Sequence, residues 1–554
     1  MQPADLVTQT THPFAAELAF TETYRRHLDN HPALREAHCL DAQFPTVFLP
    51  LRPGDRFAGR MAYNAVGFSP QHHSGQVGYY CDAAAIRADT ALLDLSPADR
   101  RAVEAMLAFW QTENTTAKVR AAFPAELARI LPSDRWTEDT GVVFPLYRMA
   151  GAALDYDRLL RRGIPGLRAD VIARRETSTD ADALPFFDAL LMILETLVKS
   201  ALYLAAQAES AADSTQFKRI AASLRAITMR APITFHEAIQ LVYLYTFHAT
   251  LQCNFGRMDV YLGDFLAADL AAGRTTRDEA LDDLVSFWRM MPAHDDNLER
   301  VKFDLRVIVG GRGRRNPENA DQFALLALDA SDRVRAIVPQ LSLRCHTGMS
   351  SAVYTRALDL LGQGATFPIL YNDDVNIPAV MHAFNVDEVT AAQYVPFGCG
   401  EMIIEHRSFG TPNAIINLPK ALEVTLHNGV DPITGQQMGQ AYGSLTDFAA
   451  FDDLLDAYFR QVKWFTDAAA DAQALEYRVV GAEAAFLFFS LLYDDCVERG
   501  KPMFSGGVRH LGGTYETYGN ITTADSLTAI RECVYVHKTI TAEKLLAALD
   551  ADFV

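Results

Sequence analysis

Between residues 305 and 371 the chain alternates apolar strand patterns with helical patterns, and this alternation constrains its fold more than any other feature. Residues 305–311, 338–344 and 367–371 have the pattern of short strands, and the first of them ends in glycines. Residues 319–331 and 351–363, which lie between them, have helical patterns. Strands that alternate with helices predict a parallel sheet covered by helices. Sheets of this kind place functional sites beyond the carboxyl ends of their strands.

The remainder of the chain is mostly helical in pattern. Apolar residues recur at intervals of three and four along residues 97–123, 156–175 and 183–227. Thr234 and Glu237 have the spacing of a capping box before a further apolar helix. Beyond the sheet region we expect helices at 417–428, 448–475, 482–499, 526–536 and 542–549, and a glycine-rich loop at 502–519. The pattern as a whole predicts one large α/β unit preceded by a mostly helical region.

Charge and composition argue against several classes of function. The chain has 554 residues and a net charge of −19, which disfavours a general surface for nucleic acid or anionic membranes. Its seven cysteines include no CxxC pair, and such a sparse set suits a reducing cytoplasm. The N-terminus lacks the basic region and apolar run of a signal peptide. The most apolar stretch carries Asp188, Glu195 and Lys199, which favours a core helix over a membrane span. We therefore expect a cytoplasmic protein that binds neither nucleic acid nor membranes.

Residues 394–402 place a thiol and a carboxylate close together in a glycine-rich turn. Only Gly400 separates Cys399 from Glu401, and Gly398 stands on the other side of the thiol. Two glycines beside one cysteine favour a tight, irregular turn. If the turn is locally extended, both side chains project the same way. A buried cysteine beside a solvated glutamate gives the same local pattern, so the meaning of this turn depends on the rest of the chain.

Short motifs of one family follow one another along the chain in the expected order. They are DYDRLLRRGIPGL at 155–167, TFHEAIQ at 234–240, GRMD at 256–259, the strand end at 367–374, GCGE at 398–401, LPKALE at 418–423, HNG at 427–429 and DDCVERG at 494–500. In this order they resemble the glycyl radical enzymes of the pyruvate formate-lyase type. The resemblance runs from about residue 20 to the last residue, and the joint order of the motifs is its specific feature.

The resemblance implies both a fold and a mechanism. The family's fold is an α/β barrel of two half-barrels with the cysteine loop threading its interior. In this chain we expect one such domain over 1–554, with a mostly helical region at 1–230 and a barrel part at 231–554. The family's mechanism makes Cys399 a thiyl radical that abstracts a hydrogen atom from the substrate and later returns it. A deep barrel suits this chemistry, because a thiyl radical must be shielded from water and oxygen.

The residues around the cysteine narrow the expected reaction. Members with a Cys-x-Glu pattern resemble eliminating or decarboxylating enzymes, in which the carboxylate, here Glu401, is a general base or proton relay. Pyruvate formate-lyases proper carry two adjacent cysteines, whereas glycines flank Cys399 here. We therefore expect a lyase that cleaves a C–O, C–N or C–C bond of a small polar metabolite, and no formate-lyase activity.

Four further residues are candidates for substrate binding. Arg407 could hold a carboxylate or phosphate through two hydrogen bonds, with His406 beside it. Asn413 lies near the position where eliminating members of the family often carry an aspartate. Asp259 lies in the GRMD turn. Each also has a structural interpretation: Arg407 could pair with a neighbouring acid, and the GRMD turn could serve packing alone.

The chain departs from the family pattern at its C-terminal end. In the family, the segment that completes the second half-barrel and carries the glycyl radical follows the position where this sequence stops. We therefore expect an incomplete barrel, with the first half-barrel and part of the second. The closest likeness to the radical loop is Arg478-Val-Val-Gly-Ala482, which lacks the family's tyrosine. Gly481 is therefore not our candidate for the radical site.

These observations leave three hypotheses open. The first is an anaerobic radical lyase that binds no cofactor itself and receives the glycyl radical from a second chain, on which an activating enzyme with S-adenosylmethionine and an iron–sulfur cluster acts. A homodimer is compatible with it. The second is an inactive, truncated relative that serves as a binding or scaffold protein. The third is a non-radical Cys399 nucleophile assisted by His406 or His427. Retention of Cys399 together with Glu401 favours the first.

Overall fold

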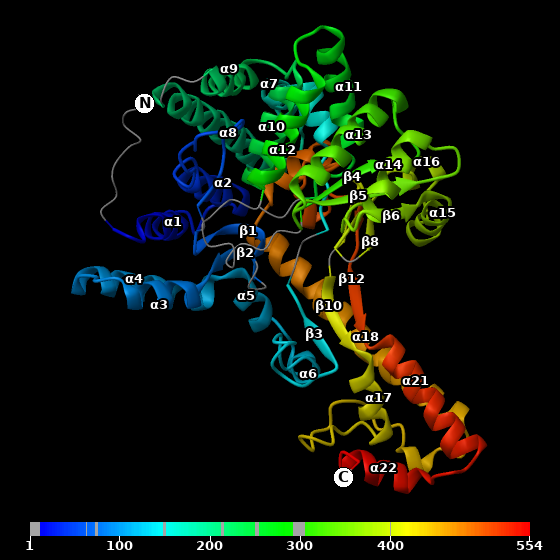
Figure 1. Cartoon of the computed structure of the whole chain (residues 1–554). Coiled ribbons are helices and arrows are strands. Elements are labelled where there is room, and N and C mark those ends of the chain that lie inside the picture. The colour runs from blue at the N-terminus through cyan, green and yellow to red at the C-terminus, as the bar shows by residue number, and fades with distance from the viewer. Residues whose placement is uncertain are drawn as a thin grey trace. The chain divides into compact units, whose positions relative to one another are not determined.

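The chain folds into two compact units, which are described separately. The computed structural model describes residues 12–62, 64–72, 76–147, 151–211, 215–249, 254–291, 305–398, 400–410 and 412–553 (Figure 1). Unit 1 comprises Met1–Ala117, Met149–Thr411 and Val480–Gly512. Unit 2 comprises Lys118–Arg148, Pro412–Val479 and Gly513–Val554. Each unit is therefore built from three separate stretches of the chain.

The N-terminal part of unit 1 combines short helices with a β-hairpin. Its elements are α1 (Ala15–Arg26), α2 (Pro32–Gln43), β1 (Val66–His72), β2 (Gln76–Cys81), α3 (Ala83–Leu92) and α4 (Pro97–Glu113). Strands β1 and β2 are antiparallel. Helix α4 begins where the Ser96 side chain accepts a hydrogen bond from the Asp99 N–H, with Pro97 in its first turn.

Long apolar helices form the largest layer of unit 1. They are α7 (Tyr156–Thr177), α8 (Leu184–Ser210), α9 (Thr215–Met229), α10 (Phe235–Ala249), α11 (Met258–Ala271) and α12 (Arg277–Met290). Every residue of α10 is buried. The helical stretch expected at 183–227 consists of two helices, α8 and α9. By length and composition the helix over Ala181–Ser210 could cross a membrane, but 56% of its apolar window is buried inside the protein, as in a core helix.

A three-stranded parallel sheet lies beside these helices, as the alternating pattern predicts. Its strands β4 (Arg306–Gly310), β5 (Gln340–Cys345) and β6 (Ile369–Asn372) are hydrogen-bonded in the order β4-β5-β6. Helices α13 (Pro317–Val334) and α14 (Ser351–Gly362) connect them (Figure 1). Helix α15 (Asp373–Phe384) begins directly after β6. The carboxyl end of β6 therefore leads into Asp373 and Asp374 at a helix N-terminus.

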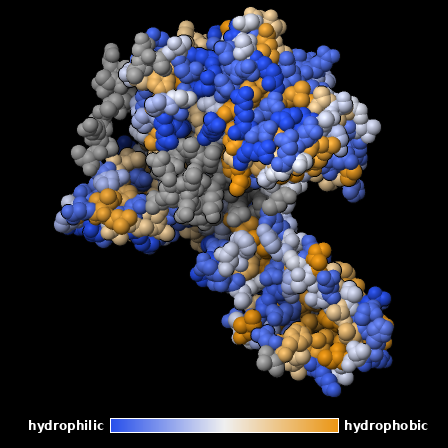
Figure 2. Space-filling model, viewed as in Figure 1, coloured by the Kyte–Doolittle hydropathy of each residue, from blue (hydrophilic) through white to orange (hydrophobic). Residues whose placement is uncertain are grey.

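Unit 2 is built around a mixed sheet with the strand order β12-β10-β3. Strand β10 (Pro412–Asn417) is parallel to β12 (Thr514–Tyr518) and antiparallel to β3 (Val143–Pro145). Its helices are α6 (Ala125–Ile130), α17 (Leu418–Leu426), α18 (Phe451–Glu483, whose last turn belongs to unit 1), α21 (Asn520–Ile530), a π-helix (Arg531–Val536) and α22 (Ala542–Asp550). Apolar side chains of α17, α21 and α22 line a groove, and Figure 2 shows hydrophobic residues gathered there, at the lower end of the view.

Two expectations for the C-terminal third are wrong. The single helix expected at 482–499 is two short helices, α19 (Leu487–Leu492) and α20 (Cys496–Arg499). They are separated where Asp494 turns to bind residues of another segment and Asp495 has a left-handed φ of 73°. The glycine-rich segment at 502–519 contains strand β12, which pairs with β10 about a hundred residues earlier in the chain. Both errors arise from partners that are distant in sequence.

Candidate functional site

The Cys-x-Glu segment is the turn of a β-hairpin in unit 1. Strands β7 (Tyr394–Phe397) and β8 (Glu401–Ile404) are antiparallel, and Phe397 pairs with Glu401. Gly398 and Gly400 have positive φ angles of 50° and 134°, which side chains other than glycine rarely adopt. Cys399 itself lies outside the described residues. The glycines on either side of it form the tight turn that the sequence predicts.

The carboxylate of Glu401 folds back over this turn. The Gly400 N–H donates a hydrogen bond to Glu401 Oε2 over 2.9 Å. A Cβ atom on Gly398 would lie 2.5 Å from the same oxygen, well inside van der Waals contact. Glycine at 398 is therefore required twice, for its backbone conformation and for the close approach of the carboxylate.

Buried side chains hold one edge of the hairpin. The carbonyl oxygens of alternate residues accept hydrogen bonds as follows: Ala392 from Arg257 (3.1 Å), Tyr394 from Arg344 (2.9 Å), Pro396 from Asn254 (3.0 Å) and Gly398 from Arg306. Tyr394 and Pro396 lie in the extended strand β7, where carbonyls two residues apart point to the same side, whereas Ala392 ends the short helix α16 (Glu388–Ala391) and Gly398 lies in the turn. Side-chain donors therefore take the place that a neighbouring strand would occupy, and they fix the position of the turn. We name these four donors, Arg257, Arg344, Asn254 and Arg306, the carbonyl clamp.

Arg306 is the member of the carbonyl clamp that reaches the turn itself. It is 1% exposed and comes from the start of β4. Its guanidinium also donates to the Tyr371 hydroxyl over 2.9 Å and to the side chain of Gln340. The Tyr371 hydroxyl lies 3.9 Å from the position of a Cβ on Gly400. Residues of β4, β5 and β6 therefore support the turn from one side.

Arg344 anchors the other end of β7 through a buried ion pair. Its Nε and Nη2 each donate to a carboxylate oxygen of Asp373 over 2.8 Å, and neither side chain is exposed to solvent. The Tyr394 hydroxyl donates to the same carboxylate over 2.7 Å. Burial raises the pKa of Asp373, but its hydrogen bonds and ion pair with Arg344 outweigh burial and lower the pKa below its usual value. Asp373 is thus held ionised as part of the scaffold.

Asp259 and Arg257 are both bound to groups of their own protein, although Asp259 Oδ1 and Arg257 Nε are buried without a hydrogen-bond partner among the described residues. Asp259 accepts a hydrogen bond from the Gly310 N–H over 2.8 Å, and Arg314 lies 3.5 Å away. Burial raises the pKa of Asp259 despite these partners. Burial lowers the pKa of Arg257 to about 10, which leaves it charged at neutral pH. These contacts describe a packing role, and a direct substrate role for Asp259 stays a prediction.

His406 and Arg407 converge on one carboxylate, that of Asp494. His406 Nδ1 lies 2.9 Å from Asp494 Oδ1, and Arg407 Nε donates to Oδ2 over 3.1 Å. Burial lowers the pKa of His406, but Asp494 and the charge of Asp155 outweigh burial and raise it above its usual value. Asp155, His406 and Asp494 each place one potential metal-ligand atom within 4.8 Å of the others. Asp155 also caps α7 through the Arg158 N–H, so these acids have established partners.

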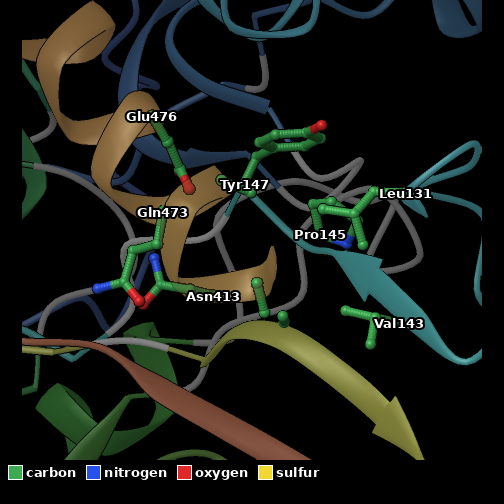
Figure 3. A pocket seen from close by; sticks show the side chains of 10 residues that line it. Leu131, Val143, Pro145, Tyr147, Asn413, Gln473 and Glu476 are labelled. Atoms are coloured by element: carbon green, nitrogen blue, oxygen red, sulfur yellow. The ribbon is translucent and has the colours of Figure 1, made fainter. Parts of the chain in front are cut away.

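Asn413 lies in unit 2, on β10, and is 3% exposed. Tyr477 donates a long hydrogen bond of 3.4 Å to its Oδ1. Asn413 lies beside Glu476 (Figure 3), a buried carboxyl on α18 whose pKa is raised to about 8 by burial and lowered only in part by Asn413. The structure therefore places Asn413 beside an acid that the sequence did not single out.

Arg306, Arg344 and Glu476 are residues that the sequence reasoning missed. A signal was present for Arg306, because it interrupts the otherwise apolar strand pattern of residues 305–309, and a weaker one for Arg344, which ends the mixed pattern of residues 338–344. A charged residue there is buried when it is paired. Glu476 gave no such signal, since an acid in a long amphipathic helix is usually solvated.

Known proteins resemble this chain in sequence. The model of the pyruvate formate lyase-like family matches residues 6–554. The trans-4-hydroxy-L-proline dehydratase of Clostridioides difficile is 25% identical over 482 residues, which are 81% of this chain and 60% of that protein. The (2S)-3-sulfopropanediol dehydratase of Klebsiella oxytoca is 26% identical over 448 residues, 74% of this chain and 53% of that protein. The chain thus spans between 53% and 60% of the length of these curated relatives.

Solved structures agree in fold. The hydroxyproline dehydratase of Clostridioides difficile, with its substrate bound, aligns with a TM-score of 0.83 at 21% identity, covering 100% of this chain and 73% of that chain. A glycyl radical enzyme from Archaeoglobus fulgidus aligns with a TM-score of 0.84 at 22% identity, covering 98% of this chain and 73% of that chain. The α/β fold described above is therefore shared with these proteins.

Proposed function

The chain belongs to the pyruvate formate lyase-like family, and from this premise we propose that it is a radical lyase. Its reaction cleaves a C–O, C–N or C–C bond of a small polar metabolite. The observation that carries this proposal is the glycine-rich hairpin turn, in which the Glu401 carboxylate accepts a hydrogen bond from the Gly400 N–H while the carbonyl clamp holds the strand. The relatives named as dehydratases support the same class of reaction.

In the proposed reaction, Cys399 transfers a hydrogen atom and Glu401 transfers a proton. The Cys399 thiyl takes a hydrogen atom from a substrate carbon, which becomes a radical while the thiol S–H bond forms. Glu401 takes the proton of a neighbouring substrate hydroxyl. The leaving group then departs from the adjacent carbon with its bonding electrons, and the product radical recovers the hydrogen atom from Cys399. The thiyl is thereby regenerated.

We propose that the glycyl radical, which converts the Cys399 thiol to the thiyl, lies outside residues 1–554. Gly481, the nearest likeness to a radical glycine, lies inside helix α18. An ideal Cβ there would lie 3.2 Å from atoms of Phe504, so Gly481 packs as part of a helix surface. In this proposal the segment that carries the radical completes the barrel, and an activating enzyme with S-adenosylmethionine and an iron–sulfur cluster acts on that segment.

The remaining assignments follow the same proposal. Arg407 and His406 would contact the substrate only when their shared carboxylate, Asp494, releases one of them, so a carboxylate of the substrate would compete with Asp494. Asn413 and Asp259 are the other proposed substrate contacts. We also place the protein in the cytoplasm of an anaerobically growing cell, because a thiyl radical does not survive oxygen.

Anaerobic reconstitution tests the proposal. The chain is purified without oxygen with any polypeptide that accompanies it, treated with an activating enzyme, and examined for a glycyl radical by electron paramagnetic resonance. Turnover is then measured with trans-4-hydroxy-L-proline, (2S)-3-sulfopropanediol and a panel of diols. We expect Cys399→Ala to abolish turnover with the radical signal intact.

The matched control for Cys399→Ala is Cys345→Ala, which removes a free cysteine from the end of β5. We expect this control to keep full activity. Turnover that persists in Cys399→Ala would refute the role of the thiyl. A stable partner complex that forms no radical and turns over no substrate would instead support the binding or scaffold hypothesis.

A further inference from the structure

Three potential metal ligands converge in unit 1, at the base of the hairpin β7–β8. Asp155 caps the start of α7, His406 follows β8, and Asp494 lies in the bend between α19 and α20. One ligand atom from each, a carboxylate oxygen or an imidazole nitrogen, lies within 4.8 Å of the other two. Atoms bound to one ion lie about 3–4 Å apart when each bond is about 2.1 Å long. The three side chains are therefore close to the spacing that a shared ion requires.

The contact between His406 and Asp494 has the separation of two metal ligands but not the geometry of a hydrogen bond. His406 Nδ1 lies 2.9 Å from Asp494 Oδ1. The same nitrogen is buried and makes no hydrogen bond with any described residue, so the ring does not direct it at that oxygen. Two atoms bound to one ion at right angles lie about 3 Å apart, and their lone pairs point to the ion instead of to each other. The observed contact fits that arrangement.

Each of the two acids keeps one oxygen for an ion. Asp155 accepts the Arg158 N–H with Oδ1 over 2.8 Å, which leaves its other oxygen. Arg407 donates to Asp494 Oδ2 over 3.1 Å, which leaves Oδ1 beside His406. Hydrogen bonds of this kind orient the ligands of known metal sites. The existing partners of both acids are therefore compatible with a metal ion.

The backbone holds the three ligand-bearing segments together. The His406 N–H donates to the Ala153 carbonyl over 2.8 Å. The Asp494 N–H donates to the His406 carbonyl over 2.8 Å, and the Asp155 N–H donates to the Leu492 carbonyl over 3.1 Å. Each segment is thus hydrogen-bonded to the other two. Ligands that are fixed in this way lose less conformational freedom when an ion binds.

The charges and the types of donor select a divalent transition metal. Glu405 is a third acid, which interacts electrostatically with His406 and Asp155, so acids outnumber the one guanidinium, that of Arg407, that donates to this cluster. One imidazole with two carboxylates suits Zn²⁺, Mn²⁺ or Fe²⁺, whereas Mg²⁺ and Ca²⁺ prefer oxygen ligands alone. The side chains of His406 and Asp494 are 20% and 24% exposed. Water can therefore reach the ion and complete its coordination.

We propose that Asp155, His406 and Asp494 form a site for a divalent transition metal ion such as Zn²⁺, with water in the remaining positions. The ion joins the start of α7, the turn after β8 and the bend before α20, and so fixes the base of the hairpin that carries Glu401. Any proton on the ligating nitrogen leaves when the ion binds. This inference goes beyond the proposed function: it makes His406 a metal ligand and leaves Arg407 as the substrate contact of that pair.

Metal titration of the intact chain tests the site without any turnover. The chain is freed of metal with a chelator and titrated with Zn²⁺ in a calorimeter, and with Co²⁺, whose visible absorption changes with its ligands. We expect one tightly bound ion per chain that a large excess of Mg²⁺ does not displace. Asp155→Asn keeps the cap of α7, since Asn caps helices as well as Asp does. His406→Asn keeps a residue that tolerates the left-handed φ of 47°. Each should weaken Zn²⁺ binding at least about a hundredfold and abolish the Co²⁺ spectrum.

The matched control is His537→Asn, which removes an imidazole that lies 3.3 Å from a single acid, Glu532. This control should bind Zn²⁺ as tightly as the wild type. A wild-type chain that binds no Zn²⁺, or equal affinity in Asp155→Asn, His406→Asn and the wild type, would overturn the proposal. Circular dichroism of the metal-free variants verifies their folding. Because the two variants preserve different local structures, failure of one to fold leaves the other decisive.

Discussion

Two buried acids, Asp373 in unit 1 and Glu476 in unit 2, have pKa shifts in opposite directions. Asp373 is completely buried and receives both arms of the Arg344 guanidinium, and its pKa is lowered. Glu476 is equally inaccessible but has only the Asn413 amide beside it, and burial raises its pKa to about 8. Burial therefore does not decide the charge of a carboxyl here. The presence or absence of a cation within hydrogen-bond distance does.

This difference distinguishes an acid with a structural role, Asp373, from an acid that can give a proton, Glu476. An ion pair such as Arg344–Asp373 fixes the strand that leads into the Cys399 turn, since Arg344 also donates to the Tyr394 carbonyl. Its charge state is constant over the physiological pH range. A neutral acid such as Glu476 has a proton to give near neutral pH, which is a property of catalytic groups. The buried acids of the two units thus have different uses.

The largest expected effect comes from breaking the ion pair of unit 1. Arg344→Met would leave Asp373 buried without its cation and would remove a donor from the carbonyl clamp. We expect the free energy of unfolding to fall by about 3–5 kcal/mol, measured by urea denaturation. The double variant Arg344→Met/Asp373→Leu should recover part of that loss, because it removes the stranded charge. A loss below about 1 kcal/mol in the single variant would contradict a structural role for the pair.

The second-largest expected effect is the dependence of the free energy of unfolding on pH that Glu476 causes. The folded protein keeps this proton up to about pH 8, whereas the unfolded chain releases it near the ordinary pKa of a glutamate, 4.5. Folding therefore binds a proton between these values, and stability falls as the pH rises from about 5 to 8. The fall attributable to Glu476 is at most roughly 4 kcal/mol. We expect denaturation curves of Glu476→Gln to lack this part of the slope, and identical slopes would show that Glu476 is ionised.

The smallest expected effect on stability comes from a substitution in the hairpin turn, Gly398→Ala. Gly398→Ala places a methyl group in a left-handed conformation and against Glu401, at a cost of about 1–2 kcal/mol. Gly435 has a similar φ of 69° but no atom within 4 Å of an added Cβ, so Gly435→Ala isolates the backbone strain. We expect both variants to lose comparable stability in urea denaturation, but only Gly398→Ala to lose activity. Equal activities would show that the position of Glu401 does not matter.

Local patterns predicted much of the fold and of the hairpin turn. The strand–helix alternation fixed the parallel sheet β4-β5-β6, because each of its strands is apolar and short and each crossover is a helix. The two glycines beside Cys399 predicted a tight turn. The same reasoning failed at 482–499, where Asp494 breaks the helix to meet His406 and Arg407. It also failed at 502–519, where strand β12 pairs with the distant strand β10.

The sequence by itself determined the class of this protein, because the order of its motifs and the periodicity of its apolar residues are properties of the chain alone. Only the tertiary structure decided which polar residues work together. The carbonyl clamp draws residues from 254 to 344 onto a strand that begins at Tyr394. Asn413 and Glu476 meet because a strand and a helix from separate segments fold together. Charge states depend on such distant neighbours and on burial, and neither is encoded in local spacing.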